Sequence, residues 1–137
     1  VTNRGDFTIE LDAEAAPGTV NNFVFLARYH YFDGTECHRI VPDFVVQTGD
    51  PRGDGWGGPG FALRDEINRQ RFGRGAVGMA LSGPDTGGSQ FFIALSPQPH
   101  LDGGYTVFGQ VAGDDSVLDQ IRQEDELVTI REVETGE

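Results

Sequence analysis

Hydrophobic and polar residues alternate near the start of the chain, over residues 6–11. The apolar side chains of this stretch fall on one face: Phe7, Ile9 and Leu11. A period of two is typical of a half-buried strand. Residues 3–5, in front of it, have the composition of a hairpin turn and predict a return from a short first strand.

The apolar spacing changes to that of a helix after Pro17. The positions that recur at intervals of three and four are Val20, Phe23, Val24 and Ala27. Proline suits a first helical turn because its missing N–H would have no partner there. We therefore predict one amphipathic helix from Pro17 to about Tyr29.

Several short apolar runs, separated by glycine and proline, are typical of strands. They cover residues 36–41, 44–48, 76–81, 90–95 and 106–111, and a closing strand is expected over 127–133. Residues 114–121 predict a second short helix, and the glycine-rich stretch 49–60 predicts a long loop. Many short strands with two helices favour a closed barrel capped by helices over a doubly wound sheet.

Composition and charge narrow the classes of protein. With 137 residues, 37% hydrophobic and 23% charged, the chain is expected to form a single domain over 1–137. No apolar run approaches the roughly 18 residues that a membrane span needs. The net charge of −12 repels phosphate backbones, which argues against nucleic-acid binding and favours peptides or proteins as partners.

Three short motifs permit other functions. The pattern G-x-G-x-x-G occurs at 53–58, but Pro and Gly follow where a dinucleotide site needs a helix. Cys37 beside His38 permits a metal site, although neighbours on a strand point to opposite faces and no second ligand pair is suitably spaced. The cell-adhesion tripeptide Arg-Gly-Asp occurs at 4–6 and 52–54, in turns where Gly and Asp are common. We expect no metal or other cofactor.

An amide and an apolar side chain share one face of two predicted strands. The pleat puts Gln90 and Phe92 together on the face away from the core, and Val45 and Gln47 repeat the pairing. Arg39 lies on a third strand that otherwise reads as buried, so it must find a partner or a cleft. From these residues alone, ordinary packing and an arginine paired with an acidic neighbour stay open.

Three long segments of the chain resemble the cyclophilin family. They are residues 38–50, 82–93 and 101–109, in the order found in that family, and the resemblance extends over essentially the whole chain. It implies a mainly β fold, a closed eight-stranded antiparallel barrel capped by two α-helices. It also implies a cofactor-free peptidyl-prolyl cis-trans isomerase that acts on proline-containing peptides and on unfolded or flexible protein segments.

The resemblance assigns roles to individual residues. Arg39 matches the catalytic arginine of the family, and Gln47 matches the glutamine that supports it. The residues implied to bind the substrate are Phe44, Val45, Ala80, Leu81, Gln90, Phe92, His100, Leu101 and Tyr105. His100 stands where many members carry a tryptophan at the pocket rim, which makes cyclosporin binding doubtful. Val45, Leu81 and Tyr105 replace the usual methionine, asparagine and histidine, so a slightly roomier ring pocket is expected.

An alternative from another class is a proline-peptide binding module with little turnover. The presence of both Arg39 and Gln47 favours the isomerase. The single cysteine excludes an internal disulfide and says little about compartment. Because the chain starts at Val1, we expect that a leader was removed or that the domain was excised. We expect a soluble monomer, either cytoplasmic or part of an exported or larger bacterial protein.

Overall fold

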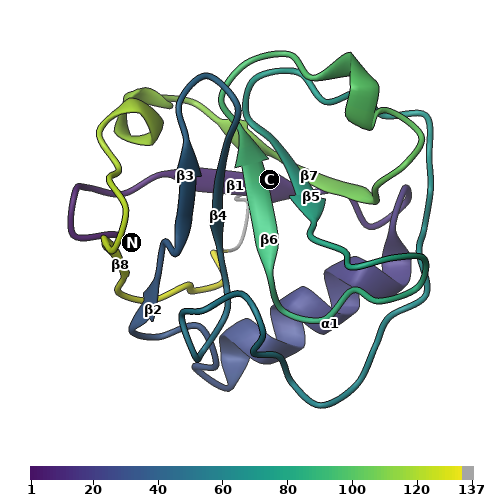
Figure 1. Cartoon of the computed structure of the whole chain (residues 1–137), viewed down its shortest axis with the longest axis horizontal. Coiled ribbons are helices and arrows are strands. Elements are labelled where there is room, and N and C mark those ends of the chain that lie inside the picture. The colour runs from purple at the N-terminus through teal and green to yellow at the C-terminus, as the bar shows by residue number, and fades with distance from the viewer. Residues whose placement is uncertain (134–137) are drawn as a thin grey trace.

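The computed structural model describes residues 1–133 (Figure 1). Its elements, with η for 3₁₀ helices, are β1 (Thr8–Leu11), α1 (Pro17–Arg28), β2 (Thr35–Glu36), β3 (Arg39–Val41), β4 (Val45–Thr48), β5 (Ala76–Met79), β6 (Phe91–Ala94), η1 (Pro99–Leu101), β7 (Val107–Ala112), η2 (Ser116–Asp119) and β8 (Glu126–Leu127). Six strands form one antiparallel sheet in the order β1-β7-β5-β6-β4-β3. The predicted loop at 49–60 is confirmed and continues to residue 75, so no helix follows the glycine pattern at 53–58. Within residues 1–133, no helix has both the length and the apolar character to cross a membrane.

The strands depart from the predicted barrel between β2 and β3. There the backbone N–H of Cys37 donates to the carbonyl of Asp125 (2.7 Å), and the N–H of Glu124 donates to the carbonyl of Cys37 (3.1 Å). The predicted strand 36–41 is therefore interrupted, with β2 paired to β8 and β3 paired to β4. Hydrogen bonds among residues 1–133 do not join the two sheets into a ring, so the closed eight-stranded barrel is not confirmed. The fold is mainly β.

The end of the described chain contains less regular structure than predicted. The expected helix over 114–121 is only the 3₁₀ helix η2, and the side chain of Asp114 accepts the N–H of Ser116 at 2.9 Å in front of it. The N–H groups of Leu118 and Gln120 donate to carbonyls three residues back, at 3.0 Å each, which is the 3₁₀ pattern and not the α-helical one. The expected strand 127–133 is limited to β8, because the N–H groups of the two residues after it donate to the carbonyl of Val1. One α-helix is therefore present in residues 1–133 instead of two.

Helix α1 is the predicted amphipathic helix, and its N-terminus is capped from a distant loop. The carboxylate of Glu66 accepts the N–H of Gly18 (3.0 Å) and both the N–H (2.6 Å) and the hydroxyl (2.7 Å) of Thr19. A carboxylate at this end also interacts favourably with the helix dipole. Although desolvation raises the pKa of Glu66, these hydrogen bonds bring it below its usual value. The cap fixes the long loop to the helix.

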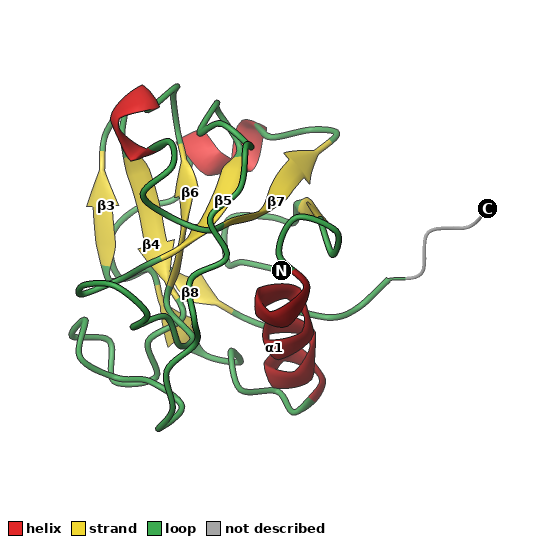
Figure 2. Cartoon of the chain, turned by 90° about the vertical axis from the view of Figure 1, so that its right-hand side faces the viewer, coloured by secondary structure: helices red, strands yellow, loops and turns green. Residues whose placement is uncertain are grey.

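The core lies between α1 and one face of the large sheet (Figure 2). Phe23 of α1 lies 5.1 Å from Phe32, 5.2 Å from Phe91 and 5.3 Å from Phe108, between ring centroids. Phe91 and Ile93 of β6 are buried in this cluster, as their alternation predicted. Aromatic pairs of this kind contribute about 0.5–1.5 kcal/mol each beyond their buried area. The opposite face of β6 is left for a second, smaller cluster.

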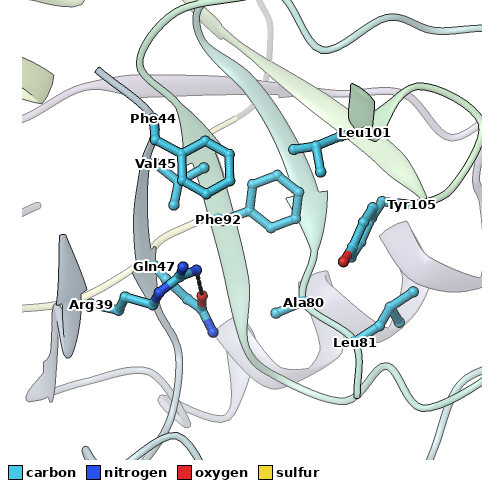
Figure 3. Close-up of a pocket in the computed structure, with 9 residues that line it drawn as sticks. All are labelled: Arg39, Phe44, Val45, Gln47, Ala80, Leu81, Phe92, Leu101 and Tyr105. Atoms are coloured by element: carbon cyan, nitrogen blue, oxygen red, sulfur yellow. Dashed lines mark hydrogen bonds between the residues drawn. The ribbon is translucent and has the colours of Figure 1, made fainter. Parts of the chain in front are cut away.

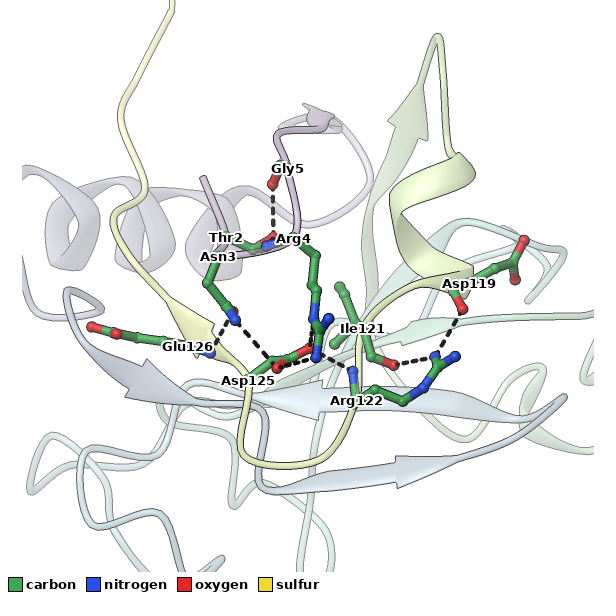
Figure 4. Close-up of polar contacts among 9 residues, drawn as sticks. All are labelled: Thr2, Asn3, Arg4, Gly5, Asp119, Ile121, Arg122, Asp125 and Glu126. Carbon is green, nitrogen blue, oxygen red and sulfur yellow. Dashed lines mark hydrogen bonds and ion pairs between the residues drawn. The ribbon is translucent and has the colours of Figure 1, made fainter.

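A buried carboxylate joins the N-terminal turn to the last part of the described chain (Figure 4). Nε of Arg4 donates to Asp125 at 2.7 Å, and the side chain of Asn3 donates to the other carboxylate oxygen at 3.2 Å. The N–H of Arg122 adds a bond of 2.7 Å. The hydrogen bond from Arg4, followed by that from Arg122, lowers the pKa of Asp125 to about 2.

The contribution of Asp125 to stability is expected to disappear in acid. Its pKa is about 2 when folded, against an ordinary value of 3.8, so the contribution is complete above about pH 4 and is lost as the pH falls through about 2. Asp125→Asn should lower the free energy of unfolding near neutral pH and flatten its decline between about pH 4 and 2. Urea unfolding across this range measures both effects.

A control is available in the same turn. Glu124→Gln removes an exposed carboxylate that accepts no hydrogen bond from residues 1–133, and it should keep the wild-type pH dependence. An Asp125→Asn profile as steep as that of the wild type would contradict the assignment.

Candidate functional site

Strand register lines up side chains on the sheet face away from α1. Arg39 of β3 lies opposite Gln47 of β4, Gln47 lies opposite Phe92 of β6, and Phe92 lies opposite Gly78 of β5. Directly opposed residues of antiparallel strands have side chains on the same face, about 5 Å apart. An arginine, an amide and an aromatic ring therefore form one row across neighbouring strands.

This row borders a pocket with a volume of about 110 Å³ (Figure 3). The residues that line it are Arg39, Phe44, Val45, Gln47, Ala80, Leu81, Phe92, Leu101 and Tyr105. All belong to the set suggested by sequence. Two others of that set lie outside the lining: Gln90 is behind Gln47, and exposed His100 packs on Phe44 with ring centroids 5.7 Å apart. The tertiary structure thus brings three distant segments of the chain together.

An aromatic cluster that the sequence only partly predicted supports the pocket. Phe92 stacks on Phe72 with centroids 5.3 Å apart, and Tyr105 meets the edge of Phe92 at 5.7 Å and 90°. Phe72 is held by its N–H, which donates to Asp102 at 2.8 Å. The only signal for Phe72 was its position as a lone apolar residue in an arginine-rich stretch. Gly78 was also missed. It lies against the rings of Phe72 and Phe92, and a side chain at this position would displace them.

The turn between β3 and β4 places Phe44 at the mouth of the pocket. Asp43 has a positive φ of 60°, and the N–H of Phe44 donates to the carbonyl of Val41 at 3.0 Å, which closes the turn. The side chain of Gln98 donates to the carbonyl of Asp43 at 3.1 Å, so the loop before η1 is tied to the same turn. Phe44 then lies under Arg39, whose guanidinium carbon is 5.7 Å from the ring centroid.

Arg39 is an exposed residue of an edge strand, which corrects the expectation of a largely buried strand. No carboxylate among residues 1–133 forms an ion pair with it, so the ordinary explanation of an acidic neighbour is wrong for the described part of the chain. Its Nη1 donates to Oε1 of Gln47 at 3.3 Å. The remaining guanidinium N–H groups are available to a ligand in the pocket.

A relay of amides orients this arginine. Gln47 uses its oxygen to accept from Arg39 and its Nε2 to donate to Gln90 at 3.1 Å. Gln90 in turn donates to the carbonyls of Gly55 at 2.8 Å and Gly57 at 3.1 Å. Each amide accepts with its oxygen and donates with its nitrogen, so hydrogen-bond donation runs in one direction, from the guanidinium to the carbonyls of the long loop.

The loop at the far end of the relay is built around Asp50. This carboxylate is fully buried and accepts the N–H groups of Arg52 (2.8 Å), Asp54 (3.0 Å) and Gly55 (2.5 Å). Desolvation raises the pKa of Asp50, but the hydrogen bonds from the backbone N–H groups together lower it by more. The pKa of Asp50 therefore lies below its usual value. At Gly57 an added Cβ would lie only 1.8 Å from Asp50 Oδ1, so only glycine fits there.

Comparison with known proteins identifies the family to which this arrangement belongs. Residues 1–135 match the family described as cyclophilin type peptidyl-prolyl cis-trans isomerase/CLD. The chain belongs to the cyclophilin family. The resemblance that the three sequence segments suggested is thereby confirmed.

Individual cyclophilins support the same assignment. A peptidyl-prolyl cis-trans isomerase of Helicobacter pylori (strain ATCC 700392 / 26695) is 44% identical over 133 residues, which cover 94% of this chain and 82% of the relative. Peptidyl-prolyl cis-trans isomerase B of Bacillus subtilis (strain 168) is 54% identical over 104 residues, 74% of this chain and 73% of the relative. A crystal structure of a Cryptosporidium parvum cyclophilin type peptidyl-prolyl cis-trans isomerase, in the presence of the dipeptide ala-pro, has a TM-score of 0.84 and 32% identity, covering 94% of this chain and 90% of that one.

In the folded chain, the arginines of both Arg-Gly-Asp tripeptides form ion pairs. Arg4 is paired with Asp125 at 2.7 Å, and Arg52 is paired with Asp54 of its own tripeptide at 2.8 Å. An adhesion ligand has to present its arginine and aspartate to a partner. These ion pairs therefore disfavour cell adhesion as a function.

Cys37 and His38 belong to no cluster of potential metal ligands within residues 1–133. Burial raises the pKa of the Cys37 thiol to about 11, which keeps it protonated and unreactive. Both ring nitrogens of His38 are buried without a hydrogen-bond partner among residues 1–133. In the same range no three His, Cys, Asp or Glu side chains converge in a metal-binding arrangement.

The close packing under the pocket predicts the effect of adding one methyl group. A Cβ at residue 78 would lie 2.7 Å from ring atoms of both Phe72 and Phe92. Gly78→Ala is therefore expected to lower the free energy of unfolding by about 1–3 kcal/mol and to displace the Phe92 ring. Urea denaturation and aromatic NMR shifts measure the two effects.

Gly58→Ala is the matched control, because its Cβ would meet nothing within 4 Å. It should change the free energy of unfolding by no more than about 0.5 kcal/mol. Equal stability of the two variants would show that the rings leave more space than the structure indicates.

Proposed function

We propose that this cyclophilin accelerates rotation about Xaa-Pro peptide bonds, with Arg39 as the catalytic hydrogen-bond donor. The observation that carries the proposal is a guanidinium without an acidic partner in the described chain, held at the edge of an apolar pocket by Gln47. In this proposal Phe44, Val45, Phe92 and Leu101 surround the proline ring, and Gln47 acts on the substrate mainly through Arg39.

The chemistry of rotation explains why such a site needs no nucleophile, base or metal. The barrier of about 18–20 kcal/mol arises because amide resonance is lost when the bond twists. In the twisted state the lone pair returns to the proline nitrogen, which can then accept a hydrogen bond. A donor at this position stabilises the transition state more than the planar ground states. Arginine suits the role because its guanidinium stays protonated at physiological pH.

The size of the effect limits what Arg39 can contribute. A single donor aimed at developing charge supplies about 3 kcal/mol, or roughly a hundredfold in rate. The apolar pocket would strengthen this hydrogen bond by excluding water and would hold the ring in position. Phe44 packs against both the guanidinium of Arg39 and the ring of His100, which restricts the positions open to Arg39.

The segment Ala80–Leu81 is proposed to hold the peptide backbone. The N–H of Ala80 donates to the carbonyl of Gln90 at 3.0 Å, which continues the pairing of β5 with β6 by one residue. At Leu81 that pairing stops, and neither its N–H nor its C=O bonds to another backbone group within residues 1–133. An extended peptide could pair with these groups as an added strand segment.

The proposed substrates are proline-containing peptides and flexible or unfolded protein segments. The Cryptosporidium parvum structure with the dipeptide ala-pro supports proline peptides as ligands. The net charge of −12 supports the exclusion of nucleic acids. Cyclosporin binding is doubtful, because exposed His100, whose ring centroid lies 5.7 Å from that of Phe44, stands where many cyclophilins carry a tryptophan.

Replacing the arginine tests the mechanism. Arg39→Ala should reduce kcat/KM on an Ala-Pro peptide by about a hundredfold, because it removes a donor worth about 3 kcal/mol in the transition state. Exchange NMR or a protease-coupled assay gives the rate, and circular dichroism verifies the fold. Arg69→Ala, an exposed arginine outside the pocket, is the matched control and should keep wild-type activity.

Two results would contradict the proposal in different ways. A folded Arg39→Ala variant with full activity would remove Arg39 from the mechanism. A wild-type protein that binds the peptide without changing its isomerisation rate would favour the alternative, a binding module.

A further inference from the structure

Trp56 is the most exposed of the large hydrophobic side chains in residues 1–133. Its exposed fraction is 81%, and the chain has no other tryptophan. Tyr29, exposed to 74%, packs its ring on Phe25 at 4.8 Å, whereas no aromatic or cation–π pair in the described chain includes Trp56. A large aromatic group left in water at a loop tip is typical of a binding contact.

The backbone that carries this indole is fixed. The residues before it are held by the buried carboxylate of Asp50, and the N–H of Trp56 itself donates to Asp54 at 2.9 Å. Gly57, directly after it, is packed against Asp50 so closely that no Cβ fits. An exposed aromatic side chain on an ordered backbone loses little conformational entropy when it binds a ligand.

The loop is also joined directly to the proposed active site. Gln90 donates to the carbonyls on both sides of Trp56, those of Gly55 and Gly57. The backbone carbonyl of Gln90 accepts the N–H of Ala80, which lines the pocket beside Leu81. Trp56 is therefore fixed next to the edge at which the pairing of β5 with β6 ends.

The pocket is too small to hold more of a peptide than the region around the proline ring. Its volume is about 110 Å³, so the rest of a substrate must run over the surrounding surface. A peptide that paired with Leu81 would pass near Gln90, whose side chain is bonded to the loop of Trp56. The charged groups nearest in sequence, Arg52 and Asp54, form an ion pair at 2.8 Å, so neither of them is an unpaired charge beside the indole.

We propose that Trp56 is a specificity-determining residue that binds a bulky apolar or aromatic side chain of the substrate, at a position flanking the Xaa-Pro pair. This inference rests on the isomerase function proposed above. It predicts that the enzyme prefers peptides with such a side chain on the flank that crosses the loop, and that the preference depends on the indole.

A peptide series in which one flanking position at a time is Ala, Phe or Lys tests the proposal. At one position the wild type should prefer Phe to Ala by about three- to tenfold in kcat/KM, mainly through KM. Trp56→Ala should bring this ratio close to one, and Trp56→Phe should keep most of it. Tyr29→Ala removes another exposed aromatic ring, far from the pocket in sequence, and should leave the ratio unchanged.

Fluorescence provides a readout that does not depend on turnover. Because Trp56 is the only tryptophan, saturation with the Phe peptide should shift its emission to shorter wavelength, whereas the Ala peptide should shift it less. This titration still decides the question if Trp56→Ala fails to fold. The titration also separates this inference from the proposed isomerase function, because it measures binding and not turnover. A wild type that binds the Phe peptide at Trp56 without isomerase activity would overturn the proposed function alone.

Three outcomes would overturn the inference. They are a wild type with no flank preference, a preference that survives in folded Trp56→Ala, and an emission spectrum that does not respond to the Phe peptide at saturation. A Trp56-dependent preference for Lys over Phe would overturn the apolar chemistry assigned to the contact.

Discussion

The antiparallel pairing of β4 with β6 determines the geometry of the site. Its register sets Gln47 opposite Phe92, and side chains alternate between the two faces of a sheet, so a slip of one strand by one residue would turn its own member of this pair toward α1. Such a slip is opposed from the other face, where Phe91 and Ile93 are buried in the main core. The hydrophobic free energy of the core thus holds an amide and a ring in position on the opposite side of the same strands.

A polar constraint acts from the opposite end of the site. Asp50 is buried, and burying a carboxylate without hydrogen-bond partners costs free energy. Asp50 therefore accepts hydrogen bonds from backbone N–H groups of the long loop. The ordered loop then offers two carbonyls to Gln90, and the amides transmit this orientation to Arg39. The long, glycine-rich loop is thereby part of the support of the arginine, although it contributes no residue to the pocket lining.

The open arrangement of the strands leaves the pocket intact. Its residues come from β3, β4 and β6, from the segment after β5, from η1 and from the approach to β7, all in or beside the large sheet. The separate β2–β8 pair and the reduced second helix lie outside this set. The likeness to the Cryptosporidium parvum cyclophilin, with a TM-score of 0.84, is consistent with a site that depends on the large sheet.

The sequence by itself determined what depends on local pattern. Alternation placed Phe92 on the face away from the core, Pro17 marked the start of the helix, and the run of glycines predicted the long loop. Family resemblance supplied the set of residues around Arg39. These features follow from the side-chain periods of strands and helices and from residues that occupy special backbone conformations.

Only the tertiary structure decided the features that depend on residues far apart in the chain. Phe72 lies in an arginine-rich stretch and supports the pocket residue Phe92 only because the fold stacks the two rings. The strand over 36–41 is split by backbone bonds to residues 124 and 125, and the cap of α1 comes from Glu66. The two partners of each contact are far apart in the sequence, so no local pattern predicts the contact. Close packing and the pairing of buried polar groups are properties of the assembled fold.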